Sequence, residues 1–151
     1  LDQFPFRDTF RKIKALSSKY IFLKKDNNGI YTSNGHISKM EYPLNEQKLD
    51  RNINKITEIF NSYLSGTDCD IYFSVVPDKN YFLAPIGGYL LLDYKALSEK
   101  IETELDFGEY IDIFSSLSID DYYKTDPHWK QEKILPTAKL LGEKMNIRSA
   151  I

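Results

Sequence analysis

The sequence is poor in cysteine and histidine, the residues that form disulfides and most zinc sites. Its 151 residues include one cysteine, Cys69, and two histidines, His36 and His128. A single cysteine excludes an intramolecular disulfide and a cysteine-based zinc cluster, because both need further thiols. We therefore expect no metal centre and no cofactor, and the cysteine count leaves the redox compartment open.

Long apolar runs are missing as well. No stretch approaches the roughly 20 apolar residues that span a bilayer. Apolar residues nevertheless make up 42% of the chain and aromatic residues 14%, which excludes a disordered chain and allows one folded core. We expect a single domain over residues 1–151. The sequence begins at Leu1, which is compatible with a signal peptide or membrane anchor upstream.

Basic residues are concentrated at the front of the chain. Residues 1–25 contain seven Lys or Arg and two Asp, which leaves 13 basic and 20 acidic residues in the remainder. A nucleic-acid partner would favour a basic domain, so we expect none. Apolar residues at Phe6, Phe10, Ile13 and Leu16 predict an amphipathic helix in this basic segment. The pattern favours an apolar stripe packed on the domain, and the alternative is a membrane surface or an anionic polymer.

The rest of the chain alternates between predicted helices and strands. Residues 20–35 predict a β-hairpin that turns at Asn27, Asn28 and Gly29. The other predicted elements are helices over 45–64, 94–105 and 129–145, the last interrupted by Pro136, and buried strands over 69–79 and 109–117. This order indicates an α/β fold with parallel strands.

A parallel sheet would place two segments at one edge. In open parallel sheets, ligands bind at the carboxyl ends of the strands. Lys79 follows the first predicted buried strand and His128 follows the second, so we expect both to face one cleft. An unpaired strand at the edge of such a sheet would also allow a homo-oligomer.

The segment "YYKTDPHW" places Asp126 two residues before His128. On one interpretation, Asp126 and Pro127 simply begin the last helix, a common arrangement for these residue types. On another, His128 is a general base whose ring is oriented by Asp126. A metal site completed by Asp120 or Asp121 is the weakest interpretation, because it has too few nitrogen and sulfur ligands for zinc.

The segments "LDQFPFRD", "IYFSVVPDK" and "YYKTDPHW" together resemble the DHHW protein family, within the SGNH-hydrolase-like group that includes alginate acetylation proteins. The resemblance implies a flavodoxin-like α/β domain that is extracytoplasmic, either secreted or anchored at the cell surface. It also implies O-acetyl transfer or ester hydrolysis, with a carbohydrate polymer and an acyl donor as partners. Asp126 and His128 would be the catalytic triad members, and Pro127 replaces a histidine of the family motif.

The serine that this resemblance implies would lie downstream of the Asp-x-His segment. No G-x-S-x-G motif is present, and Ser115, Ser116 and Ser118 lack the glycines that expose a nucleophile on a sharp turn. We therefore expect the N-terminal portion of the domain, which would be inactive by itself. The alternative is a non-catalytic binding module associated with polysaccharide or the cell wall.

The candidates for substrate contacts are Lys79, Tyr123 and Trp129. Trp129 could stack on a sugar ring, although a lone tryptophan here also fits the core. Tyr122 and Tyr123 would point to opposite faces, so we expect one to pack and the other to reach the cleft. Lys79 could stabilise developing negative charge or be solvated. We expect His36 to be a surface residue.

Overall fold

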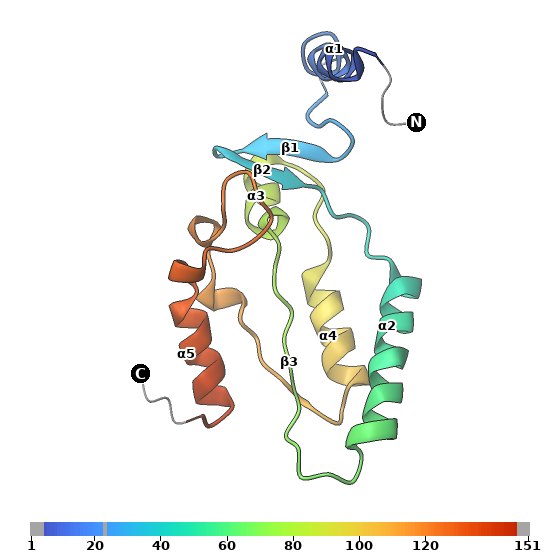
Figure 1. Cartoon of the computed structure of the whole chain (residues 1–151), viewed down its shortest axis with the longest axis vertical. Helices are drawn as coiled ribbons and strands as arrows, with labels where there is room; N and C mark the ends of the chain where they lie inside the picture. The colour runs from blue at the N-terminus through green and yellow to red at the C-terminus, as the bar shows by residue number, and fades with distance from the viewer. Residues whose placement is uncertain (1–4, 23, 148–151) are drawn as a thin grey trace.

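The computed structural model describes residues 5–22 and 24–147 (Figure 1). The helices are α1 (Arg7–Tyr20), α2 (Glu46–Ile59), α3 (Lys79–Gly87), α4 (Tyr94–Glu104) and α5 (Leu135–Lys144). The strands are β1 (Ile30–Ser33), β2 (His36–Lys39), β3 (Tyr72–Phe73) and β4 (Glu109–Tyr110). A π-helical turn, Phe60–Leu64, continues α2, and 3-10 turns occur at Phe114–Ser116, Ile119–Asp121 and Gln131–Lys133. The chain is therefore a mixed α/β structure, as predicted.

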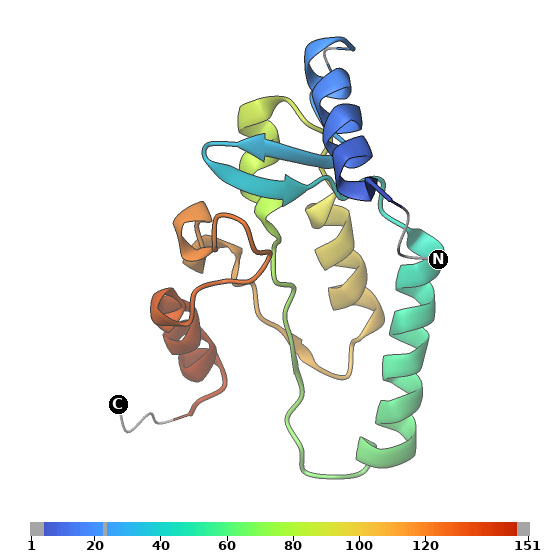
Figure 2. The same cartoon turned by 45° about the horizontal axis from the view of Figure 1, so that its top comes forward.

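The parallel pair β3–β4 lies at the centre of the body. Tyr72 pairs with Glu109 and Phe73 with Tyr110. Helices α2 and α4 lie on one side of β3 and α5 on the other (Figures 1 and 2). Both predicted strands thus exist and run parallel, but the ladder is only two residues long. None of its four residues is fully buried, so the expectation of buried strands was wrong. Within residues 5–22 and 24–147, the ladder is the one parallel pair rather than part of a larger sheet.

The core lies beyond the end of β4, under the segment that contains His128. Ile111, Ile113 and Leu117 form its buried centre. Partly buried residues packed against them are Tyr72, Phe82, Trp129, Ile134, Leu140, Leu141 and Met145. Because α5 supplies Leu140 and Leu141 to this core, burial of its apolar face holds the helix against the end of the parallel pair.

The β-hairpin exists, but the predicted turn was wrong. The strands β1 and β2 are antiparallel, with Ser33 opposite His36, so the chain reverses at Asn34 and Gly35. Both turn residues have positive φ, 47° and 74°, as a tight two-residue hairpin turn requires. Asn28 and Gly29 form a second turn. Before this turn, Asn27 forms only an isolated bridge with Ile30, and the charged residues Lys24, Lys25 and Asp26 do not favour a strand.

Helix α3 was not predicted from the sequence. The Asp78 side chain accepts hydrogen bonds from the backbone N–H groups of Asn80 and Tyr81, which caps the helix. Gly88 ends the helix in a left-handed conformation with φ of 63°. Pro85 lies inside this short helix, so the pattern of the segment was typical of a loop.

The last helix begins later than predicted. Helix α5 starts at Leu135, with Pro136 in its first turn, so the interruption at Pro136 is a fresh helix start. Residues 126–128 are therefore not helical. The interpretation of Asp126 and Pro127 as a helix start was wrong.

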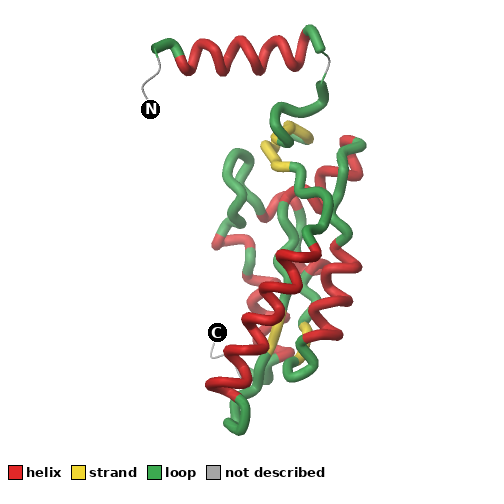
Figure 3. Tube along the Cα trace, turned by 90° about the vertical axis from the view of Figure 1, so that its right-hand side faces the viewer, coloured by secondary structure: helices red, strands yellow, loops and turns green. Residues whose placement is uncertain are grey.

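The expectation that α1 packs on the domain was also wrong. The helix forms as predicted, but none of its residues is buried. It lies at one end of the molecule, apart from the other helices (Figure 3).

Candidate active site

A short backbone ladder closes the loop that holds Asp126 and His128. Tyr122 and Trp129 form an isolated antiparallel bridge. The N–H of Tyr123 donates to the carbonyl of His128 at 3.1 Å, and the N–H of Lys130 donates to the carbonyl of Asp121 at 2.6 Å. The loop is therefore a small hairpin, and Asp126 and His128 lie at its tip.

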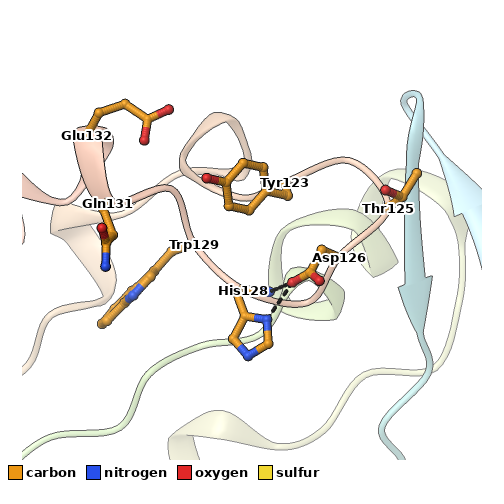
Figure 4. Close-up of a pocket in the computed structure, with 7 residues that line it drawn as sticks. All are labelled: Tyr123, Thr125, Asp126, His128, Trp129, Gln131 and Glu132. Carbon is orange, nitrogen blue, oxygen red and sulfur yellow. Dashed lines mark hydrogen bonds and ion pairs between the residues drawn. The ribbon is translucent and has the colours of Figure 1, made fainter.

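The two side chains contact each other as the general-base interpretation predicts. The Asp126 Oδ1 atom lies 2.5 Å from His128 Nδ1 and also accepts the backbone N–H of His128 at 2.8 Å (Figure 4). These bonds from the backbone and the ring hold the pKa of Asp126 below its usual range. The carboxylate is thus positioned to keep the proton on Nδ1 when the ring is neutral, which leaves Nε2 as the acceptor.

The pair faces an open pocket. Its volume is about 640 Å³, and its lining residues are Tyr123, Thr125, Asp126, His128, Trp129, Gln131 and Glu132 (Figure 4). The His128 side chain is 80% exposed and that of Asp126 is 53% exposed. The expectation that His128 faces an opening is therefore confirmed. Lys79 does not line this pocket, so the expectation that the two residues share one cleft was wrong.

The aromatic neighbours divide between the core and the pocket. Tyr122 is buried and donates its hydroxyl to the carbonyl of Pro77, whereas Tyr123 is exposed and lines the pocket. The expectation that one tyrosine packs and the other reaches the opening is confirmed. Trp129 packs against the core and also lines the pocket, so it belongs to both.

The amino group of Lys79 binds the backbone of the loop that holds Asp126 and His128. It is the first residue of α3 and is only 4% exposed. Its Nζ atom donates to the carbonyls of Tyr123 at 3.1 Å and Lys124 at 3.2 Å. Burial lowers the pKa of Lys79, and the charge of Asp126 acts in the opposite direction. The interpretation of Lys79 as a solvated lysine was wrong, and its amino group is engaged with the loop backbone.

The hairpin β1–β2 contributes a second support that the sequence did not indicate. The N–H of Ile37 donates to the carbonyl of Lys124 at 2.7 Å. The carbonyl of Lys124 therefore accepts from β2 as well as from α3. No local pattern could have predicted this contact, because it joins residues that are far apart in the chain.

The described part of the chain places no serine hydroxyl in hydrogen-bond contact with His128. Ser116 shares a hydrogen bond with Thr137 at 2.9 Å, and Ser118 donates to Asp121. Three further lining residues, Thr125, Gln131 and Glu132, were not singled out from the sequence, because polar residues in loops carry no distinctive pattern.

The other histidine, His36, lies outside the pocket. His36 is 4% exposed, so the expectation of a surface residue was wrong. Its Nδ1 atom lies 3.1 Å from the carbonyl of Asn34, inside the β1–β2 turn. No cluster of three or more His, Cys, Asp or Glu among residues 5–22 and 24–147 is arranged to hold a metal ion.

Comparison with known proteins found no matching family model, no matching curated protein and no matching solved structure. No helix in the part of the chain that the structure describes is long and apolar enough to cross a membrane.

Proposed function

We propose that Asp126 and His128 are the acid–base half of a serine-type acyl-transfer site in an SGNH-hydrolase-like protein. The observation that supports this most directly is the contact between Asp126 Oδ1 and His128 Nδ1 at the opening of a pocket. Nε2 has no hydrogen-bond partner among the described residues. This is the arrangement that a histidine needs to accept a hydroxyl proton.

The proposed reaction has two stages. In the first, Nε2 takes the proton of a serine hydroxyl while the serine oxygen attacks the acetyl carbonyl of the donor. The bond between the carbonyl carbon and the donor oxygen breaks, and the imidazolium returns the proton to that oxygen. In the second stage, Nε2 takes the proton of an acceptor hydroxyl while the acceptor oxygen attacks the acetyl carbonyl. The bond between the carbonyl carbon and the serine oxygen then breaks, and the imidazolium returns the proton to the serine. A sugar hydroxyl gives transfer, and water gives hydrolysis.

The serine in this proposal comes from a part of the protein outside the sequence described. The same part would extend β3 and β4 into the flavodoxin-like parallel sheet of the SGNH-hydrolase-like group. It would also shield the pair from water, because charge stabilisation in a transition state is strongest in a site that excludes solvent. We therefore expect this chain alone to be inactive in acyl transfer.

The proposed substrate is an acetylated or acceptor polysaccharide outside the cytoplasm. Tyr123 is 44% exposed and lines the pocket beside Trp129 and His128. Aromatic faces next to polar side chains suit a sugar ring, which has apolar C–H faces and polar edges. Lys79 supports the loop rather than the ligand in this proposal, since its amino group already binds two carbonyls.

A second candidate is a binding module that holds polysaccharide without chemistry. It is favoured by the open pocket and by the serine hydroxyls of the described residues, whose hydrogen bonds do not include His128. The two candidates differ in what His128 does. A base requires one defined tautomer, whereas a binding residue does not.

The decisive experiment measures acetate release from an aryl acetate by the protein that includes the serine-bearing part. His128→Ala should lower turnover by about 100-fold or more, the usual contribution of a general base. His36→Gln is the matched control, because His36 is the other histidine and lies in the β1–β2 turn. Unchanged turnover in His128→Ala would exclude His128 from the mechanism and favour the binding module.

A second measurement tests the pair in the present chain. Long-range ¹H–¹⁵N spectra of neutral His128 should show the proton on Nδ1, and Asp126→Ala should remove that preference. An unaltered tautomer in Asp126→Ala would mean that the carboxylate does not orient the ring.

A further inference from the structure

Helix α1 exposes a continuous apolar stripe. Phe6, at its start, and Ile13, Leu16 and Tyr20 along it are between 55% and 75% exposed. The stripe continues into Ile21 and Phe22, which are 72% and 66% exposed. Exposed apolar patches of this extent are uncommon on soluble proteins and mark surfaces that contact another phase or molecule.

Basic side chains border this stripe on both sides. At about 3.6 residues per turn, Lys12 and Lys19 fall along one margin of the stripe, and Arg7 and Lys14 fall along the other. Asp8 is the one acidic residue of α1. The four basic residues on these margins are all exposed. Long basic side chains in these positions can reach a charged layer above the level at which the apolar residues are buried.

We propose that α1 lies in the surface of an anionic lipid bilayer, with its apolar stripe among the acyl chains and its lysines at the phosphate level. An amphipathic helix with a basic polar face and aromatic and aliphatic residues on the other face has the composition of such interfacial helices. The charge of the remainder supports this orientation. It holds 13 basic and 20 acidic residues, so an anionic surface would attract α1 and repel the body.

Other occupants of the stripe fit the charges less well. A second copy of α1 would bring two sets of basic margins together. A nucleic acid would satisfy the lysines but would leave the apolar stripe in water. An anionic bilayer satisfies both features at once. The geometry of the rest of the molecule allows it, because α1 projects from one end and the body does not cover it (Figure 3).

The test is sedimentation of the whole chain with vesicles, comparing pure phosphatidylcholine with a mixture of phosphatidylcholine and phosphatidylserine. The mixed vesicles should bind at least about tenfold more tightly, and added salt should weaken the binding. Replacing Lys12, Lys14 and Lys19 by Gln should remove about tenfold or more of the affinity for mixed vesicles. Replacing Ile13 and Leu16 by Gln should abolish binding to both kinds of vesicle.

The matched control replaces three exposed lysines of the body, Lys48, Lys55 and Lys139, by Gln, which changes the net charge equally. This control should bind as the unmodified chain does. Equal loss in both triple variants would overturn the proposal, because it would show a response to overall charge alone. Failure to bind mixed vesicles would also overturn it. So would self-association in solution that the Ile13 and Leu16 replacements abolish, because a second copy would then cover the stripe.

Discussion

At the scale of single residues, the hydrogen bonds from His128 favour the charged form of Asp126. One oxygen accepts both the backbone N–H and the ring of His128. Charged Asp126 is thereby favoured, and its pKa lies below the usual range for aspartate. The side chain is more than half exposed, so water screens the interaction and its effect on global stability is small.

This geometry predicts a pH response with a defined sign. Because the pKa of folded Asp126 is lowered, its contribution to stability is complete above the pKa of the unfolded chain, and it is lost as the pH falls through the folded value. An NMR titration of the Asp126 carboxyl should therefore show a midpoint below about 3.9.

The same titration separates the two hydrogen bonds. His128→Ala removes the ring contact and keeps the backbone N–H, so the midpoint of Asp126 should move part of the way back. His36→Gln should leave it in place. A normal midpoint in the unmodified chain would contradict the short contact between Asp126 and His128.

At the scale of secondary-structure elements, two separate elements hold the loop at one point. Helix α3 contributes the Lys79 amino group, and strand β2 contributes the Ile37 N–H, and both reach the carbonyl of Lys124. The loop tip is itself exposed, so these hydrogen bonds are what fix its position relative to the core. The position of the Asp126–His128 pair is therefore set by elements that lie more than 40 residues earlier.

Removing the amino group should loosen the loop. Lys79→Met keeps most of the buried hydrocarbon but leaves the Tyr123 carbonyl without this donor, and we expect a loss of about 1–3 kcal/mol in the free energy of unfolding. Urea denaturation measures that loss. Hydrogen exchange should become faster at the N–H groups of Tyr123 and His128.

Lys95→Met is the matched control for this prediction. Lys95 is also near the start of a helix, but it is exposed and forms only a surface ion pair with Glu99 at 3.6 Å. It should change the free energy of unfolding by less than about 1 kcal/mol. Equal effects of the two substitutions would mean that the Lys79 contacts do not hold the loop.

The elements themselves were predictable to different degrees. Helices α2 and α4 were predicted because each has apolar residues at helical spacing and a clear end. Helix α3 was missed because it is short and contains Pro85. The turn of the hairpin was misplaced because two Asn-Gly pairs compete, and only Asn34–Gly35 has strand-forming residues on both sides.

At the scale of the whole molecule, α1 is an appendage of the body. It has no buried residue, and a hydrogen bond from Lys14 to Asn28 at 3.1 Å joins it to the following turn. The body has its own core around Ile111, Ile113 and Leu117. The stability of the body therefore does not depend on α1.

Deleting residues 1–22 should leave the body folded. Since α1 buries no side chain, the free energy of unfolding should change by no more than about 0.5 kcal/mol, as for a surface substitution. Chemical denaturation followed by tyrosine and tryptophan fluorescence measures this change. A large destabilisation would show that α1 packs on the body in solution.

The candidate site was partly readable from the sequence. The two-residue spacing of Asp126 and His128 predicted their contact, because such a spacing allows a side chain to reach back within one turn of chain. The division of Tyr122 and Tyr123 between core and pocket followed from the alternation of an extended segment. The role of Lys79 did not follow, because its partners are carbonyls of a distant loop, which no side-chain pattern reveals.

The sequence alone determined the local features of this protein: the amphipathic helices, the parallel relation of two apolar strands, and the pairing of a carboxylate with an imidazole two residues away. These depend on spacing along one segment, which is fixed before folding. Only the tertiary structure decided that the body leaves α1 uncovered, which Asn-Gly pair turns the hairpin, and what holds the loop in place. Those outcomes depend on burial and on hydrogen bonds between segments far apart in the chain. The local sequence allows several arrangements of each segment, and only these long-range contacts determine which one forms.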